Sequence, residues 1–160
     1  MNDATTNTIS ATLVKESQRL SILPRFFGPK LMMRGENLVY GWLGSLSQDY
    51  TGGYWHFYTL SNGGFYMAPA SGESFHLVCS GNYFEGDLSA DAAGIVATLF
   101  AVCQLAGEAG TDQLVDLYHN LRDFAGEHVE ASAIFAAIDY PEDSVPFIDK
   151  SHTPKCRRML

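Results

Sequence analysis

The sequence predicts an α+β fold, in which an antiparallel four-stranded meander at about residues 54–88 packs against several helices. Two observations lead to this class. Short aromatic or alternating segments separated by tight-turn residues fill the middle of the chain, and helical spacing of apolar residues follows them. Strands that come together in sequence before a run of helices are typical of α+β domains. At 160 residues, 46% of them hydrophobic, we expect one packed domain at 1–149 and a flexible basic tail at 150–160.

Ahead of the meander, the chain predicts two helices joined by a loop. The first covers residues 10–20, where Leu13 and Leu20 share one helical face. Pro24 and Pro29 bracket the loop, since proline interrupts regular structure. Residues 36–46 repeat apolar side chains at the spacing of an amphipathic helix, so we expect the second helix there.

The meander itself is predicted from its turns. Asn62-Gly63 is typical of a type I′ hairpin turn, in which both central residues have positive φ. Further turn residues at 71–73 and 80–82 divide the remaining segment. We therefore expect four strands, at 54–60, 65–68, 74–79 and 83–87.

Three helices are expected after the strands. Ser89 is a suitable N-cap residue for the first, and residues 92–106 are apolar on nearly all sides, which indicates a buried central helix. Thr111 begins a second, whose apolar face is made by every third or fourth residue. A short last helix is expected at 130–138.

The charge is unevenly distributed. The net charge is −8, but no Lys or Arg occurs from Gly35 to Leu121, where nine carboxylates lie, and the two ends are basic. This acidic balance argues against strong nucleic-acid binding. The negative charge between the basic ends is also too dilute to imitate DNA over the whole surface. It amounts to roughly one net charge per 500 Å², against about one per 100 Å² for a DNA duplex.

The cysteines and the apolar segments indicate a cytoplasmic protein with no membrane partner. Cys79, Cys103 and Cys156 form an odd, unpatterned set, unlike a secreted disulfide framework. The first residues lack the basic and apolar regions of a signal peptide. The longest apolar stretch, 92–106, is shorter than the ~20 residues that a bilayer needs.

Motifs for catalysis, cofactors or metals are absent from the sequence, so we predict no catalytic, cofactor-binding or metal residues. The candidates for binding a partner are aromatic or acidic. Aromatic side chains occupy both faces of the predicted strand at 54–60, so either one face is exposed for recognition or helices cover both. The candidate residues are Tyr54, Trp55, Tyr58 and Tyr66 in the strands, Glu85 and Asp87 on one face of the last strand, and Asp139, Glu142 and Asp143 in an acidic loop.

Several of these segments resemble the ArdB/KlcA antirestriction family. The likeness is carried by Tyr50-Thr51-Gly52-Gly53-Tyr54-Trp55-His56-Phe57-Tyr58, by Asn62-Gly63-Gly64-Phe65-Tyr66-Met67, by Pro-Arg-Phe-Phe-Gly at 24–28 and by Glu85-Gly86-Asp87. The resemblance implies a small non-enzymatic protein from a mobile element such as a plasmid. Such a protein protects incoming DNA from the host's type I restriction–modification enzymes, and its partner is that enzyme or an associated host protein, reached directly or indirectly.

Two other hypotheses remain open at this point. Glu85 and Asp87 are a carboxylate pair, as a small hydrolase would use for acid–base catalysis. Alternatively, the basic ends of the chain would bind DNA and make the protein an adaptor.

Overall fold

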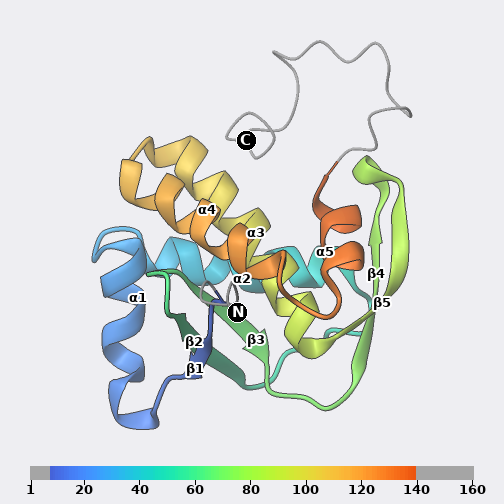
Figure 1. Cartoon of the computed structure of the whole chain (residues 1–160), viewed down its shortest axis with the longest axis horizontal. Coiled ribbons are helices and arrows are strands. Elements are labelled where there is room, and N and C mark those ends of the chain that lie inside the picture. The colour runs from blue at the N-terminus through green and yellow to red at the C-terminus, as the bar shows by residue number, and fades with distance from the viewer. Residues whose placement is uncertain (1–7, 140–160) are drawn as a thin grey trace, which may run out of the picture.

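The computed structural model describes residues 8–139 and confirms the α+β class (Figure 1). Five strands and five α-helices occur in this range. In chain order they are β1 (Ala11–Leu13), α1 (Arg19–Phe27), α2 (Met32–Leu46), β2 (Trp55–Leu60), β3 (Phe65–Pro69), β4 (Ser74–Cys79), β5 (Phe84–Ser89), α3 (Ala90–Ala109), α4 (Asp112–Ala125) and α5 (Ala131–Ile138). The short 3₁₀ segments Glu16–Gln18 and Ser80–Asn82 precede α1 and β5.

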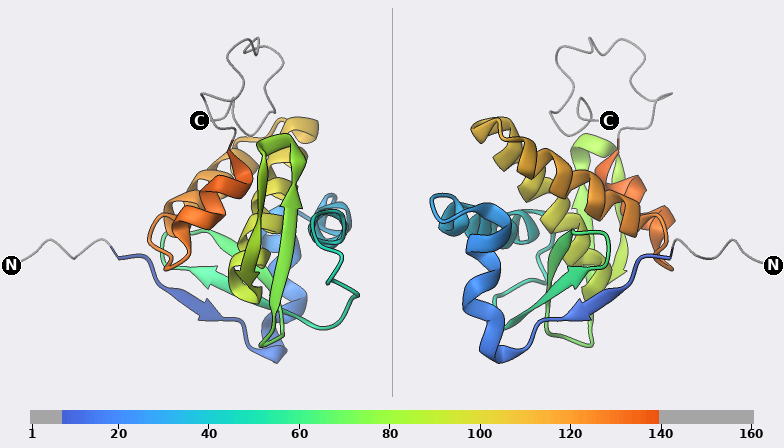
Figure 2. Two further views of the ribbon diagram at one scale, coloured as in Figure 1. Left: turned by 90° about the vertical axis from the view of Figure 1, so that its right-hand side faces the viewer. Right: turned by 60° about the vertical axis from the view of Figure 1, so that its left-hand side comes forward.

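The strands form two antiparallel sheets instead of one meander. All four expected strands are present, but β1, β2 and β3 form one sheet, while β4 and β5 form a separate hairpin. The two views of Figure 2 show that hairpin standing apart from the three-stranded sheet. The central helix α3 packs against β3 and also against β4 and β5.

The close approach of α3 explains why β3 does not pair with β4. Gly94 of α3 lies so near β3 that an added Cβ would stand 2.4 Å from the Met67 carbonyl oxygen and 2.4 Å from the Ala68 Cα. One turn later, the buried Thr98 hydroxyl accepts a hydrogen bond from the Met67 N–H (3.2 Å) and donates one to the Met67 carbonyl (3.3 Å). The helix therefore satisfies backbone groups that a neighbouring strand would otherwise bind.

Helix α3 is the buried central helix that the sequence predicts. Ser89 caps it by accepting a hydrogen bond from the Ala92 N–H (3.1 Å), and Gly110 ends it with a φ of +71°. With 20 residues it is longer than expected, and by length and composition alone it could cross a membrane. In the structure, however, 78% of its most apolar window is buried, as in the core helix of a globular protein.

The N-terminal prediction is wrong in two places. Residues 11–13 form a strand, because their backbone pairs with the edge of β2, and the helix begins only at Arg19. Helix α1 then continues through Pro24, where a loop was expected. Its buried Phe26 and Phe27 both pack on Phe65, with ring centroids 4.8 and 5.5 Å apart. Burying two aromatic side chains gains about 3–6 kcal/mol, enough to offset the cost of about 3 kcal/mol for proline inside a helix.

The turn between β2 and β3 also differs from the expected type I′. Gly63 has a φ of +91°, but Asn62 does not have a positive φ. The Gly63 N–H donates to the Leu60 carbonyl (3.0 Å), and the Leu60 N–H donates to the Gly64 carbonyl (2.9 Å), which is a type I turn followed by a glycine bulge. The side-chain amide of Asn62 links this turn to α4, because it donates a hydrogen bond to the Asn120 carbonyl at 2.8 Å.

Candidate partner-binding face

The two faces of β2 have different roles. Trp55 and Phe57 are buried, with 2% and 3% of their surface exposed, whereas Tyr54 is 52% exposed and Tyr58 is half-buried. Of the two arrangements left open by the sequence, neither holds along the whole sheet: the face of Trp55 and Phe57 belongs to the core, while the other face is exposed at Tyr54 but covered by Phe124 of α4 where it reaches Tyr66. Tyr66 is also buried, so Tyr54 and Tyr58 are the members of this predicted group that solvent reaches.

The solvent-facing side of β2 begins a continuous row of rings. Centroids in this aromatic row lie 4.8–6.4 Å apart, and Tyr58 stacks on Tyr66 at 4.8 Å. Such spacing allows favourable edge-to-face and stacked contacts. The row leads from the exposed end of β2 across β3 to α4 and the loop after it, through Tyr54, His56, Tyr58, Tyr66, Phe124 and His128.

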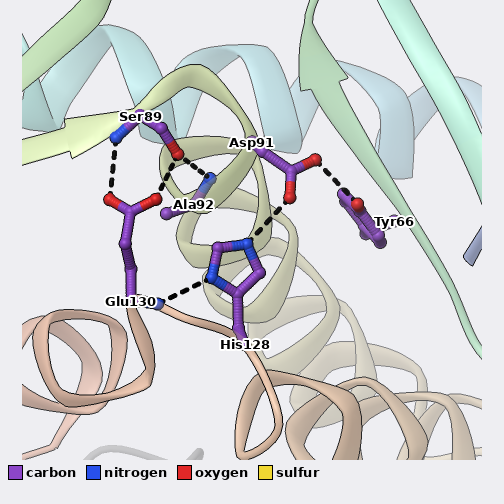
Figure 3. A network of polar contacts seen from close by, with 6 residues as sticks. All are labelled: Tyr66, Ser89, Asp91, Ala92, His128 and Glu130. Carbon is purple, nitrogen blue, oxygen red and sulfur yellow. Dashed lines mark hydrogen bonds and ion pairs between the residues drawn. The ribbon is translucent and has the colours of Figure 1, made fainter. Parts of the chain in front are cut away.

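At its inner end the aromatic row contacts a carboxylate, Asp91, in the first turn of α3 (Figure 3). Asp91 accepts hydrogen bonds from the Tyr66 hydroxyl (2.7 Å) and from His128 Nε2 (2.8 Å). His128 Nδ1 accepts the Glu130 N–H at 3.0 Å, so the proton of this neutral ring lies on Nε2. The ring is therefore fixed as a donor to Asp91.

These contacts keep Asp91 charged. Burial works to raise the pKa of Asp91, but the hydrogen bonds from His128 and Tyr66 outweigh it and hold that pKa below its usual value. The pKa of Tyr66 is raised, first by burial and then by its hydrogen bond to Asp91. The tyrosine therefore stays a neutral donor, and Asp91 remains an anion at neutral pH.

The loop before α5 holds the beginning of α3 in place. The Glu130 carboxylate accepts hydrogen bonds from both the backbone N–H (3.0 Å) and the hydroxyl of Ser89, the residue that caps α3 (Figure 3). The position of Asp91 is thus set by contacts from β3, from the α4–α5 connection and from the helix cap.

Two cavities lie beside the aromatic row. The first, here called the Asp91 cavity, has a volume of about 310 Å³; His56, Tyr58 and Asp91 line it together with Ala90 and residues 68–72. The second, of about 500 Å³, includes Asp49, Tyr54 and Glu73, and it shares Pro69, Ala70 and Ser71 with the first. Neither lining contains Lys or Arg, so both cavities are acidic or neutral.

Glu85 and Asp87 share one face of β5, as predicted, and a histidine joins them. His76 of β4 lies 2.6 Å from Asp87 through Nδ1 and 2.8 Å from Glu85 through Nε2. All three side chains are well exposed, at 45–71%. Because carboxylates occupy both ring nitrogens of His76, neither nitrogen is free to act as a general base. The sequence analysis missed His76, although the pairing of His76 with Asp87 in the β4–β5 register places it there.

A pH titration tests this cluster. Hydrogen bonds to Asp87 and then Glu85 raise the pKa of His76 above its ordinary value. The resulting contribution to stability is therefore complete below about pH 6.5 and is lost as the pH rises through the raised pKa. We expect the E85Q/D87N double variant to return the His76 pKa to its ordinary range, measured by NMR titration of the imidazole. E73Q, which removes a carboxylate outside this cluster, is the control, and an unchanged His76 titration in the double variant would contradict the expectation.

The remaining charged candidates are partly accounted for. Asp139 forms a two-point ion pair with Arg122 of α4, at 2.9 and 3.2 Å, and is half-buried. Glu142, Asp143 and the basic segment 150–160 lie outside the described residues. Two arginines near the N-terminus also have partners. Arg34 pairs with Glu108 at 2.7 Å, and the Arg19 guanidinium lies over the rings of Tyr54 and Phe57.

Fold and site together define an α+β protein with an acidic, aromatic face. Among residues 8–139, no group of three or more His, Cys, Asp or Glu side chains is placed to hold a metal ion. Residues 48–139 match the family model described as "Antirestriction protein". The chain therefore belongs to the antirestriction protein family, as the resemblance in its sequence indicates.

Individual relatives agree with this family. An antirestriction protein KlcA from Escherichia coli is 61% identical over 135 residues, which cover 82% of this chain and 95% of the relative. The uncharacterized protein YfjX from Escherichia coli strain K12 is 38% identical over 82% of this chain and 88% of its own length. A solved structure is 57% identical, with a TM-score of 0.78 over 87% of this chain and all of its own. It comes from work on KlcA and ArdB that describes a novel fold and antirestriction activity against type I DNA restriction systems in vivo but not in vitro.

Proposed function

We propose that this chain is an antirestriction protein that lowers the activity of type I restriction–modification systems in the cell and so protects incoming mobile-element DNA. The observation that carries the proposal is its similarity to KlcA along nearly the whole of that relative. The structure related to it at 57% identity belongs to proteins with this activity in vivo.

We further propose that the protein works in the cytoplasm through protein contacts, with the restriction enzyme or an associated host protein as its partner. The solved relatives act in vivo but not in vitro, which favours a mechanism that needs a component of the cell. Net charge too dilute for wholesale DNA mimicry favours a local contact. The exposed part of the aromatic row and the two cavities supply a surface of that kind.

A plating assay tests the proposal. Cells with a type I restriction system would express the chain or carry an empty vector, and both would be infected with unmodified phage. We expect expression to raise the plating efficiency toward that of phage modified by the same system, since fewer incoming genomes would be cut.

Two controls make the result specific. Modified phage, and cells without a restriction system, should show equal plating with and without the protein. Unchanged restriction of unmodified phage, at a protein level confirmed by immunoblot, would contradict the proposed function.

A further inference from the structure

The Asp91 carboxylate, which lines the Asp91 cavity, can accept further hydrogen bonds. The Asp91 side chain is 40% exposed and lines the cavity, while its two oxygens receive one hydrogen bond each, from Tyr66 and His128. A carboxylate offers about four acceptor positions, so this arrangement leaves room for further donors. The network behind Asp91 orients the carboxylate without neutralising it, because both Tyr66 and His128 donate as neutral groups.

The wall beside Asp91 is aromatic. Tyr58 stacks on Tyr66, is half-buried, and lines the cavity together with His56. A guanidinium group stacks favourably on such rings, and its planar fork also matches a carboxylate. A ring surface next to a fixed carboxylate is therefore suited to a cation with a flat charged group.

One member of the aromatic row, Tyr54, already contacts a guanidinium within the chain. The central carbon of Arg19 lies 4.5 Å from the centroid of Tyr54 and 4.2 Å from that of Phe57. Tyr54 is the neighbour of His56 in the row. Tyr58, four residues after Tyr54, offers similar ring chemistry, and Asp91 in the same cavity lining adds a negative charge.

None of the described Lys or Arg residues lines the Asp91 cavity. Neither cavity lining includes Lys or Arg, and none occurs in the sequence between Gly35 and Leu121. Asp49 and Glu73 in the neighbouring cavity add negative charge on the same side of the molecule. A volume of about 310 Å³ is at the lower end of the range for small-molecule sites, roughly 300–1,000 Å³, and suits a single side chain.

We propose that the Asp91 cavity binds an arginine side chain of a partner protein, whose guanidinium pairs with Asp91 and stacks on Tyr58. This inference deepens the proposed function and rests on it for the identity of the partner, a protein of the restriction machinery or one that acts with it. Binding of arginine itself can be measured on the purified chain.

The binding test uses a blocked tripeptide, acetyl-Gly-Arg-Gly-amide, titrated into the ¹⁵N-labelled full-length protein. We expect chemical-shift changes centred on Ala70, Ser71 and Asp91, and weaker binding of the lysine analogue, because an ammonium group cannot form the planar two-point contact. The glutamate analogue should not bind. Absence of localised shifts with the arginine peptide, or equal affinity for the lysine analogue, would overturn the inference.

Matched variants separate the ring and the carboxylate from general effects. Y58L removes the ring and should weaken arginine binding by about tenfold, whereas Y58F keeps the ring and should bind as the wild type does. D91N should weaken binding by a similar factor, while D116N removes an exposed carboxylate of α4 outside the cavity and should not. Because Asp91 also supports Tyr66 and His128, the Y58L and Y58F pair keeps the test valid if D91N unfolds. Equal binding by Y58L and Y58F would refute the role of the ring.

The plating assay then connects the cavity with function. We expect Y58L to lose protection and Y58F to retain it. If the wild type protects and Y58L protects equally well, the cavity is not the contact and the inference is wrong, although the proposed function stands. If the wild type gives no protection, the proposed function fails, and the peptide titration still decides whether the cavity binds arginine.

Discussion

Replacement of Gly94 by alanine is expected to lower the free energy of unfolding by about 3 kcal/mol, at the upper end of the usual cost of overpacking. The added methyl group would stand 2.4 Å from both the Met67 carbonyl oxygen and the Ala68 Cα. These are backbone atoms of a paired strand, so they cannot move aside as the end of a flexible side chain can. Urea unfolding of the purified full-length variant, followed by circular dichroism, measures the change.

Gly41 provides the matched control. It lies in α2, is exposed, and an added Cβ would meet no atom within 4 Å. The G41A variant should therefore gain about 0.5–1 kcal/mol, since alanine is the better helix former. Equal stability of the G94A variant and the wild type would show that α3 lies further from β3 than the structure places it.

The T98V variant is expected to lose about 2–4 kcal/mol. Valine has nearly the shape of threonine but lacks the hydroxyl, so it would leave the Met67 N–H and carbonyl without their partner in a fully buried position. An unsatisfied buried polar group costs about 1–3 kcal/mol. Urea unfolding gives the total, and hydrogen exchange of the Met67 amide should become faster than in the wild type.

The T98S variant separates the hydroxyl from the methyl group. Serine keeps both hydrogen bonds to Met67 and loses only one buried methyl, so its cost should be about 1 kcal/mol. If the valine and serine variants were equally stable, the hydroxyl would have no role in closing the edge of β3.

The parts of the fold that the sequence predicts depend on local signals. The buried helix α3 follows from the Ser89 cap and the apolar run after it, and the four strands from 55 to 89 follow from the turn residues between them. The division into two sheets depends on Gly94 and Thr98, which meet Met67 about 30 residues away in the chain. Pro24 was misleading, because the packing of Phe26 and Phe27 on Phe65 decides the helix there.

The candidate face shows the same division. The common side of Glu85 and Asp87 follows from the alternation of side chains along a strand, and His76 could be added once the strand register is known. Asp91 accepts hydrogen bonds from Tyr66 and His128, which are 25 and 37 residues away in the chain, and no local pattern in the sequence predicts these contacts. Such a site is a product of tertiary packing between segments far apart in the chain.

The covering of β3 by α3 also bears on how the protein behaves when it is abundant. An uncovered strand edge is a template on which another chain can add a strand, which leads to aggregation. In the three-stranded sheet, Gly94 and Thr98 bring α3 over one edge, and within residues 8–139 the other edge is formed by β1, which has only three residues. Three residues extend about 10 Å, too short for stable pairing between molecules. The same two side chains that divide the strands into two sheets thus also protect this sheet from intermolecular strand addition.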